Sequence, residues 1–197
     1  MLNIGVLISG GGTNLQAIID ETKSGGINGT IKLVISNKEN AYGLERARLS
    51  GIKAVYETDE DKIIELLKEN NIDLIVLAGY LKIITSKFVD EFRNKIINIH
   101  PSLIPSFCGK GYYGENVHQG VIDYGAKVTG ATVHFVDEGA DTGAIIMQET
   151  VNVEQDDDAK SLAKRVLEVE HRILKESIRL FCENKLSIQG RRVFINE

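Results

Sequence analysis

Short hydrophobic runs alternate with amphipathic segments along the first half of the chain. The runs show little polar alternation, which is typical of parallel strands buried on both faces of a sheet. The intervening segments carry apolar residues at helical spacing. The pattern predicts strands over 2–8, 31–36, 53–56, 73–77 and 95–99, and helices over 14–23, 41–49, 60–70 and 86–92. It therefore predicts an α/β fold, with a mostly parallel twisted sheet and helices on both faces.

The pattern changes after Pro101. A glycine-rich loop over 107–114 precedes a short predicted helix near 117–124. Two longer predicted strands, 127–136 and 143–153, are joined by a short loop, which indicates an antiparallel extension of the sheet. The pattern then predicts a long helix over 159–184 and a terminal hairpin over 186–195. Because no linker interrupts the pattern, we expect a single domain over 1–197.

Composition narrows the classes of partner. Hydrophobic residues make up 43% and charged residues 26% of the chain, and the net charge is −5. Scattered basic residues predict no nucleic acid partner, and the short apolar runs predict no membrane partner. The cysteines, Cys108 and Cys182, have neither disulfide-framework nor zinc-site spacing, which favours a reducing compartment. With no leader-like N-terminus, we expect a cytoplasmic protein.

A glycine-rich turn follows the first predicted strand. Ser9-Gly10-Gly11-Gly12-Thr13-Asn14 leads directly into the first predicted helix. Glycines let a backbone approach an anion closely, and the first amides of a helix carry partial positive charge. The turn matches neither the triphosphate-binding loop nor the dinucleotide fingerprint. It therefore predicts a monophosphate site, although a tight turn alone would also favour glycine.

Asn98 and His100 lie two residues apart at the end of a predicted strand, just before Pro101. The spacing puts both side chains on one face of the strand, at the end where open α/β sheets place ligands. The asparagine amide can donate to an oxyanion, and the histidine can act as a general acid near neutral pH. The alternative is that backbone hydrogen bonds satisfy both side chains.

The loop between the two later strands supplies carboxylates. Asp137, Glu138 and Asp141 lie in it, and an acid next to His100 would raise the pKa of that histidine and orient it. Spacing does not identify which acid does so, and a solvated loop is the alternative. His118 and His134 are further candidates, with His134 better interpreted as a satisfied histidine within a strand.

Glu170 lies on the apolar stripe of the long predicted helix, four residues after Val166 and three before Ile173. A carboxylate there can receive a substrate amine or backbone donors. It can equally lie at the edge of the stripe.

Five stretches, spread over essentially the whole chain, resemble the folate-dependent formyltransferases. They are Ile8–Gln16 (ISGGGTNLQ), Ser36–Asn37, Leu77–Tyr80 (LAGY), Asn98–Pro105 (NIHPSLIP) and Val133–Asp137 (VHFVD). The Asn-x-His-Pro-Ser-Leu segment is typical of folate-dependent formyl transfer. The early glycine loop is typical of the purine-biosynthesis branch, the phosphoribosylglycinamide formyltransferase family.

This resemblance implies a Rossmann-like formyltransferase fold, 10-formyltetrahydrofolate as co-substrate, glycinamide ribonucleotide as acceptor, and no metal. It implies three catalytic residues: Asn98, His100 and Asp141. It implies an acceptor site made of Gly12, Thr13, Asn14 and Glu170. It implies a reduced-folate site made of Leu81, Lys82, Ile83, Ile84, Asn98, Asp137, Glu138, Gly139, Ala140 and Asp141. Lys82 departs from the arginine common in the family, which replaces a planar, bidentate donor by a point charge.

The mechanism expected from this resemblance begins with attack of the neutral acceptor amine on the formyl carbon. Asn98 and a protonated His100 stabilise the oxyanion, and Asp141 keeps His100 charged. We expect a monomer or a weak homodimer. The rival functions are a formyltetrahydrofolate hydrolase, a methionyl-tRNA formyltransferase, a non-catalytic phosphometabolite-binding protein and a nicotinamide-dependent dehydrogenase. The first two families carry additional domains that we do not expect here.

Overall fold

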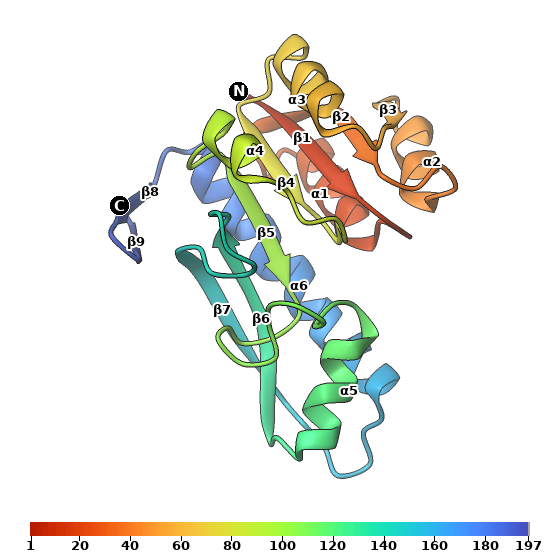
Figure 1. Cartoon of the computed structure of the whole chain (residues 1–197), viewed down its shortest axis with the longest axis vertical. Coiled ribbons are helices and arrows are strands. Elements are labelled where there is room, and N and C mark those ends of the chain that lie inside the picture. Colours follow the sequence, from red (N-terminus) through yellow and green to blue (C-terminus); the bar gives the residue numbers. More distant parts are fainter. Residues whose placement is uncertain (197) are drawn as a thin grey trace.

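Five parallel strands form the first part of a nine-stranded sheet in the computed structural model, which describes residues 1–196 (Figure 1). In sheet order they are β3 (Lys53–Tyr56), β2 (Gly29–Ser36), β1 (Leu2–Ile8), β4 (Leu74–Leu77) and β5 (Ile96–His100). The helices that connect them are α1 (Thr13–Ser24), α2 (Tyr42–Leu49), α3 (Glu60–Glu69) and α4 (Ser86–Glu91). The predicted parallel core is confirmed.

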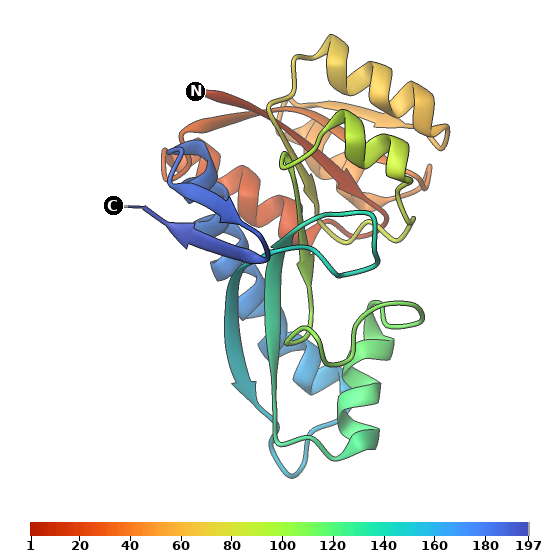
Figure 2. The ribbon, with the colours of Figure 1, turned by 60° about the vertical axis from the view of Figure 1, so that its left-hand side comes forward.

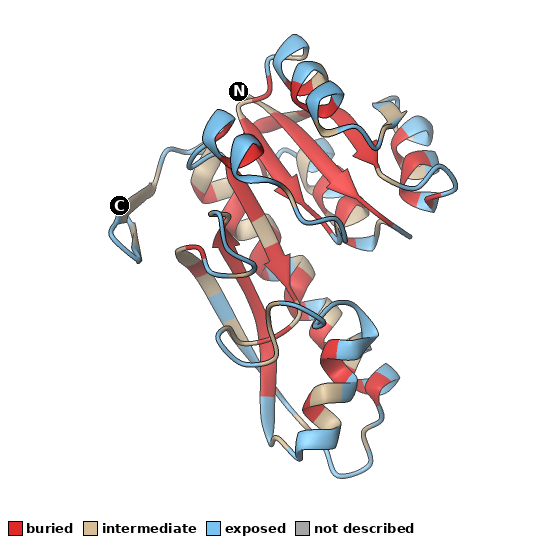
Figure 3. Cartoon of the chain, viewed as in Figure 1, coloured by how far each residue is buried: buried red, intermediate tan, exposed pale blue. Residues whose placement is uncertain are grey.

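Both faces of this parallel sheet are buried, as the unbroken hydrophobic runs predicted (Figure 3). Successive residues of a strand point to opposite faces. Val6 of β1 belongs to a hydrophobic cluster that includes residues of α1 and α2, whereas its neighbour Leu7 belongs to a second cluster with residues of α3 and α4. The buried strand residues therefore pack under a helix layer on each face of the sheet.

The second part of the molecule is antiparallel. β6 (Val128–Phe135) pairs with β5 on one side and with β7 (Ile145–Asn152) on the other, as predicted. The short helix α5 (Glu115–Tyr124) and the long helix α6 (Ala159–Cys182) pack against each other, and α6 runs alongside both parts of the sheet (Figures 1 and 2). The predicted terminal hairpin is present as β8 (Leu186–Gln189) and β9 (Arg192–Ile195).

Several helix boundaries differ from the prediction by one or two residues, and two of these differences have clear conformational reasons. α6 ends at Cys182 rather than at 184, since Asn184 adopts a left-handed conformation with φ 56°. Left-handed residues commonly terminate helices. α5 begins at Glu115, directly after Gly114 with φ 54°, and not near 117. No helix within residues 1–196 has the length and apolar character needed to cross a membrane.

The strand order reverses direction at β1, which has β2 on one side and β4 on the other. The segments that follow the carboxyl ends of β1 and β4 therefore lead away in opposite directions, which opens a crevice between them. The glycine turn follows β1, Gly79 and Tyr80 follow β4, and β5 ends at His100. The topology thus gathers the three segments at one end of the sheet.

Candidate active site

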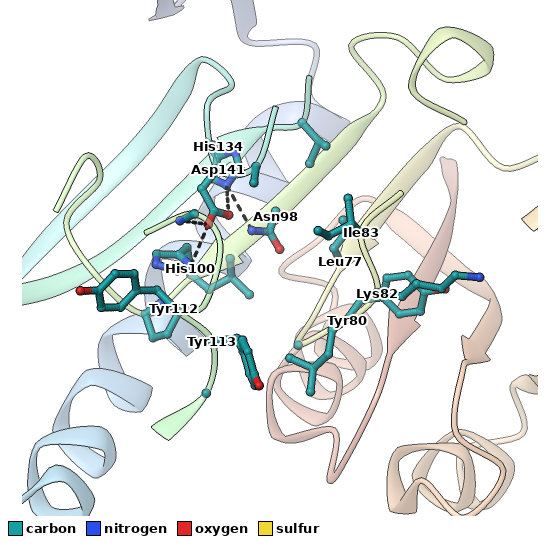
Figure 4. Close-up of a pocket in the computed structure, with 18 of the residues that line it drawn as sticks. Leu77, Tyr80, Lys82, Ile83, Asn98, His100, Tyr112, Tyr113, His134 and Asp141 are labelled. Carbon is teal, nitrogen blue, oxygen red and sulfur yellow. Dashed lines mark hydrogen bonds and ion pairs between the residues drawn. The ribbon is translucent and has the colours of Figure 1, made fainter. Parts of the chain in front are cut away.

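A cleft of about 600 Å³ opens at this end of the sheet. The start of α1, the loop after β4, the tip of β5, the loop before α5, the β6–β7 loop and α6 all contribute to its lining, whereas Gly12 lies just outside the lining. Asn98, His100 and Asp141 lie together on one wall (Figure 4). Thr13, Asn14 and the loop after β4 line other parts of the same cleft, so the structure brings most of the predicted site residues together.

His100 is fixed in orientation by the backbone. Its ring is buried, and Nε2 lies 2.9 Å from the Phe107 carbonyl oxygen, to which it can donate. The other ring nitrogen, Nδ1, faces Asp141 with 3.7 Å to the carboxylate oxygen Oδ2. Nδ1, with either a lone pair or a proton, therefore faces Asp141.

Burial of the His100 ring acts against the expected role of Asp141 in keeping that ring protonated. Burial lowers the pKa of His100, and the nearby Asp141 and the Phe107 carbonyl oppose that shift without cancelling it. The pKa of His100 therefore lies below its ordinary value, which favours the neutral ring. Spacing along the sequence could not reveal how deeply the ring is buried.

Asp141 is held in a left-handed conformation with φ 57° by its own contacts. Its Oδ2 accepts a hydrogen bond of 2.9 Å from the Gly109 amide, and Oδ1 lies 3.7 Å from His134 Nε2. Burial alone would raise the pKa of Asp141, but the nearby His100 ring and the hydrogen bond from the Gly109 amide oppose burial, and the pKa lies below its ordinary value. Asp141 is therefore a carboxylate at neutral pH, and it lies between two imidazoles.

His134 has a role that the sequence interpretation did not assign. Its Nδ1 lies 2.7 Å from the Phe135 carbonyl oxygen, so that nitrogen carries the proton, and Nε2 accepts from Asn98 Nδ2 at 3.1 Å. An amide nitrogen has two hydrogens, so Asn98 keeps a second donor for a ligand. His134 of β6 lies opposite Asn98 of β5. Knowledge of this strand register would have predicted the contact between the two side chains.

The predicted acceptor residues lie at the start of α1 and on the facing side of α6. Gly12, with φ 72°, precedes the first helical residue, and no side chain caps this helix. Asn14 Nδ2 donates to Glu170 Oε2 at 2.8 Å, whereas Asn14 Oδ1 is buried and has no hydrogen-bond partner. Burial raises the pKa of Glu170, which is 8% exposed. Glu170 therefore lies in the cleft wall, not at the edge of the apolar stripe.

His118, the other candidate histidine, also lines the cleft. It is buried on α5, where its Nδ1 has no hydrogen-bond partner, and burial lowers the pKa of its ring.

The predicted folate residues divide into two groups. Leu81 and Ile83 line the cleft while 49% and 75% exposed, which gives an apolar wall open to a ligand. The Lys82 side chain extends away from the Asn98–His100–Asp141 group, and its Nζ donates to the Thr58 carbonyl at 2.6 Å (Figure 4). The ammonium group is thus hydrogen-bonded to the backbone, away from the wall that contains Asn98, His100 and Asp141.

The residues of the acidic loop over 137–141 also divide into some that line the cleft and one that does not. Gly139, Ala140 and Asp141 line the cleft, together with Asp137, whose carboxylate accepts from the Gly139 amide at 3.1 Å and so holds the loop. The Glu138 carboxylate instead pairs with Arg93 at 2.5 Å. Glu138 does not line the cleft, and its contribution to a folate site stays a prediction.

The arrangement combines three chemical capabilities in one cleft. Asn98 and His100 can stabilise negative charge on a carbonyl oxygen, and Asp141 can accept or relay a proton. The uncapped start of α1 favours an anion. The exposed apolar wall favours a flat, poorly hydrated ligand. Such a cleft fits a transfer of an acyl-type group between two bound molecules.

The sequence is similar to those of known proteins. A family model described as formyl transferase matches residues 2–178. A phosphoribosylglycinamide formyltransferase from Haemophilus influenzae is 43% identical over 100% of this chain and 94% of its own length. A chloroplastic phosphoribosylglycinamide formyltransferase from Vigna unguiculata is 40% identical over 93% of this chain, and the chain spans 62% of that relative's length.

Solved structures agree with this fold. The crystal structure of glycinamide ribonucleotide transformylase 1 from Symbiobacterium toebii is similar with a TM-score of 0.94 and 44% sequence identity. The similarity covers 100% of this chain and 95% of that protein's chain.

Proposed function

The chain belongs to the formyl transferase family, and from that premise we propose that it transfers a formyl group from 10-formyltetrahydrofolate to the amine of 5′-phosphoribosylglycinamide, in de novo purine biosynthesis. The observation that carries this proposal is the meeting of Asn98, His100 and Asp141 in one cleft with the start of α1 and Glu170. The relatives named above support the choice of acceptor.

The acceptor would lie across α1 and α6. Its phosphate would take the free amides at the start of α1, and the Glu170 carboxylate would accept a hydrogen bond from its amine. The folate ring would lie against the apolar wall that contains Leu81 and Ile83. These placements bring the amine and the formyl carbon to Asn98 and His100 at the tip of β5.

The chain's own groups would assist each step of the transfer. As the amine nitrogen attacks the formyl carbon, the free Nδ2 hydrogen of Asn98 would donate to the carbonyl oxygen. The new negative charge would add to that of Asp141 beside His100, which raises the pKa of the ring at the moment when a proton is useful. The bond from the formyl carbon to the folate nitrogen then breaks. That nitrogen gains one proton, and the amine loses one through Asp141 or water.

Holding both reactants in one cleft supplies much of the rate. Placing two reactants in contact is worth roughly 7–11 kcal/mol at best relative to free solution.

An acceptor-dependent assay tests the proposal. The purified protein should convert 10-formyltetrahydrofolate to tetrahydrofolate only when 5′-phosphoribosylglycinamide is present, with one formylated product for each folate consumed. Consumption of the donor without acceptor would favour the rival hydrolase. Binding of the acceptor with no turnover would favour a phosphometabolite-binding protein.

Substitutions at the tip of β5 test the catalytic assignment. Asn98→Ala and His100→Ala should each lower turnover by about 100-fold or more, since removal of one preorganised oxyanion donor has effects of that size. Circular dichroism should show that both variants fold. Near-normal turnover of a folded variant would remove that residue from the mechanism.

We also propose that the protein works in the cytoplasm, where 10-formyltetrahydrofolate would have to be supplied. Cys108 and Cys182 are both unpaired thiols, which fits a reducing compartment.

A further inference from the structure

Helix α2 lies directly against the glycine turn. The Gly43 amide donates to the Gly10 carbonyl at 3.0 Å. A Cβ atom on Gly12 would lie only 2.8 Å from Gly43 Cα, so the two backbones approach closely because both residues are glycine. The glycine turn, which leads directly into the cleft-lining residues Thr13 and Asn14, is therefore supported by α2, a helix that does not line the cleft.

Arg46 extends this support by one turn of α2. Its Nε donates to the Gly11 carbonyl at 2.8 Å, and its Nη1 donates to Gln16 Oε1 at 3.2 Å. The guanidinium carbon lies 4.9 Å from the centroid of the Tyr42 ring. These partners fix the planar guanidinium group but do not neutralise its charge, because they are two neutral oxygens and an aromatic ring.

These contacts determine which way the peptide groups of the turn face. In a trans peptide the carbonyl and the following N–H point in opposite directions. The carbonyls of Gly10 and Gly11 are both engaged by α2, so the amides of Gly11 and Gly12 point away from it. Glycine peptides rotate easily when such contacts are lost, since glycine has the widest range of allowed dihedral angles.

A buried polar atom in the first turn of α1 also indicates a ligand here. Asn14 is 8% exposed, and its Oδ1 has no hydrogen-bond partner. Native proteins rarely leave buried polar atoms without partners unless a ligand or water supplies one.

We infer that Arg46 is a positioning residue for the acceptor's phosphate group: it holds the Gly11 carbonyl behind the turn so that the amides of Gly11 and Gly12 face the anion, and its charge favours the anion from that side. This inference rests on the proposed function, because it assigns the phosphate of the acceptor to the glycine turn.

Arg46→Met, Arg46→Gln and Arg46→Lys test this inference against the matched control Arg48→Met. Arg48 is an exposed residue of the same helix, where it pairs with Glu45 at 3.6 Å. The measurements are the KM for each substrate, kcat, and the inhibition constant of inorganic phosphate against the acceptor.

In Arg46→Met the acceptor KM and the phosphate inhibition constant should both rise about tenfold, as expected for loss of a charge-assisted hydrogen bond. The folate KM and kcat should stay within about twofold, and Arg48→Met should match the parent protein. Arg46→Gln keeps an N–H donor without charge, and Arg46→Lys keeps the charge without the planar fork, so each should recover part of the loss.

An unchanged phosphate constant in Arg46→Met would overturn the inference. So would an equal rise in the constants of both substrates with a lowered melting temperature, because that result indicates general loosening. If the parent protein fails to formylate the acceptor, the proposed function falls while the inference is still decided by calorimetric titration of inorganic phosphate into the parent and Arg46→Met. Equal phosphate binding by the parent protein and Arg46→Met, or no phosphate binding by either protein, would then contradict the inference.

Discussion

The His100 imidazole is subject to two opposing influences. Its burial favours the neutral ring, while the Asp141 carboxylate at 3.7 Å favours the charged ring. Burial is the stronger influence, so the pKa of His100 lies below its ordinary value. A neutral resting ring is suited to the proposed transfer, since it can gain a proton as negative charge develops on the formyl oxygen.

Asp141→Asn should lower the pKa of His100 further, because the negative charge that opposes burial is removed. The titration of the His100 ring in NMR spectra measures this pKa directly. The pKa of His100 should lie below 6.5, its ordinary value, in the parent protein and lower still in the variant. Turnover of the variant should fall by about 100-fold. A pKa that stays unchanged or rises in the variant would show that Asp141 does not act on His100 electrostatically.

Glu170→Gln should weaken acceptor binding and remove part of its pH dependence. Because burial raises the pKa of Glu170, the carboxylate is lost on acidification at a higher pH than for an ordinary glutamate. The acceptor KM of the parent should therefore rise as the pH falls towards that pKa. In the variant, KM should be about tenfold higher at neutral pH and less sensitive to acid.

Glu168→Gln is the matched control, because Glu168 is exposed on the same helix. If it changed the acceptor KM as much as Glu170→Gln, the effect would come from net charge rather than from the cleft.

The individual site residues differ in how far sequence could identify them. Asn98 and His100 could be predicted from the sequence because strand periodicity places both side chains on one face. Asp141 was not separable from Asp137 and Glu138 by spacing, since loop conformation decides which carboxylate turns inward. The pairing of His134 with Asn98 needs the register of two strands that lie 36 residues apart at that pair. Arg46 reaches the glycine turn only through the packing of α2, which no local pattern records.

At the scale of elements, the hydrophobic pattern located every helix and strand but not their exact ends. β1 and β3 agree with the predicted bounds because buried runs between polar turns define them clearly. Helix ends depend on single residues in unusual conformations, as Asn184 shows. The cleft-lining loop over 79–85 has no periodic pattern, and its conformation depends on contacts such as the hydrogen bond from the Leu81 amide to Ser9 Oγ at 2.8 Å.

Helix α4 follows this loop and is anchored mainly by Phe88. Phe88 is fully buried, and its ring lies 5.3 Å from that of Phe92. Phe88→Ala should lower the free energy of unfolding by about 3–5 kcal/mol, as large-to-small core substitutions do. Urea denaturation measures this value. The neighbouring exposed residue offers a control, and Lys87→Ala should leave the urea midpoint nearly unchanged. A midpoint of Phe88→Ala that stayed close to the parent would mean that the core relaxes around the lost ring.

At the scale of the whole molecule, β5 connects the two parts. It pairs in parallel with β4 and in antiparallel with β6, and its last residues supply Asn98 and His100. The cleft is lined by segments from both parts, including the loop after β4 and the β6–β7 loop. A ligand in this cleft therefore contacts segments that are distant in sequence and should stabilise the molecule as a unit.

This stabilisation by a ligand in the cleft should appear as a rise in the thermal unfolding temperature. A ligand present at 100 times its dissociation constant stabilises the folded state by about 2.7 kcal/mol, which corresponds to roughly 5–10 °C for a chain of this size. Differential scanning calorimetry with the acceptor, and separately with a non-reactive folate analogue, should show shifts of this order. An acceptor lacking its phosphate should give a clearly smaller shift, and an equal shift would argue against anion binding by the glycine turn.

The position of Asn98 and His100 on a strand paired on both sides has an evolutionary consequence. The groups proposed to act on the formyl carbon lie on a strand that pairs on both sides, whereas most segments proposed to bind the two reactants, such as α1, α6 and the loop after β4, are separate elements. Mutations can then remodel the preference for one reactant without disturbing either the other reactant or the reacting centre. This architecture allows new specificities to arise by drift in peripheral segments around an inherited chemical core.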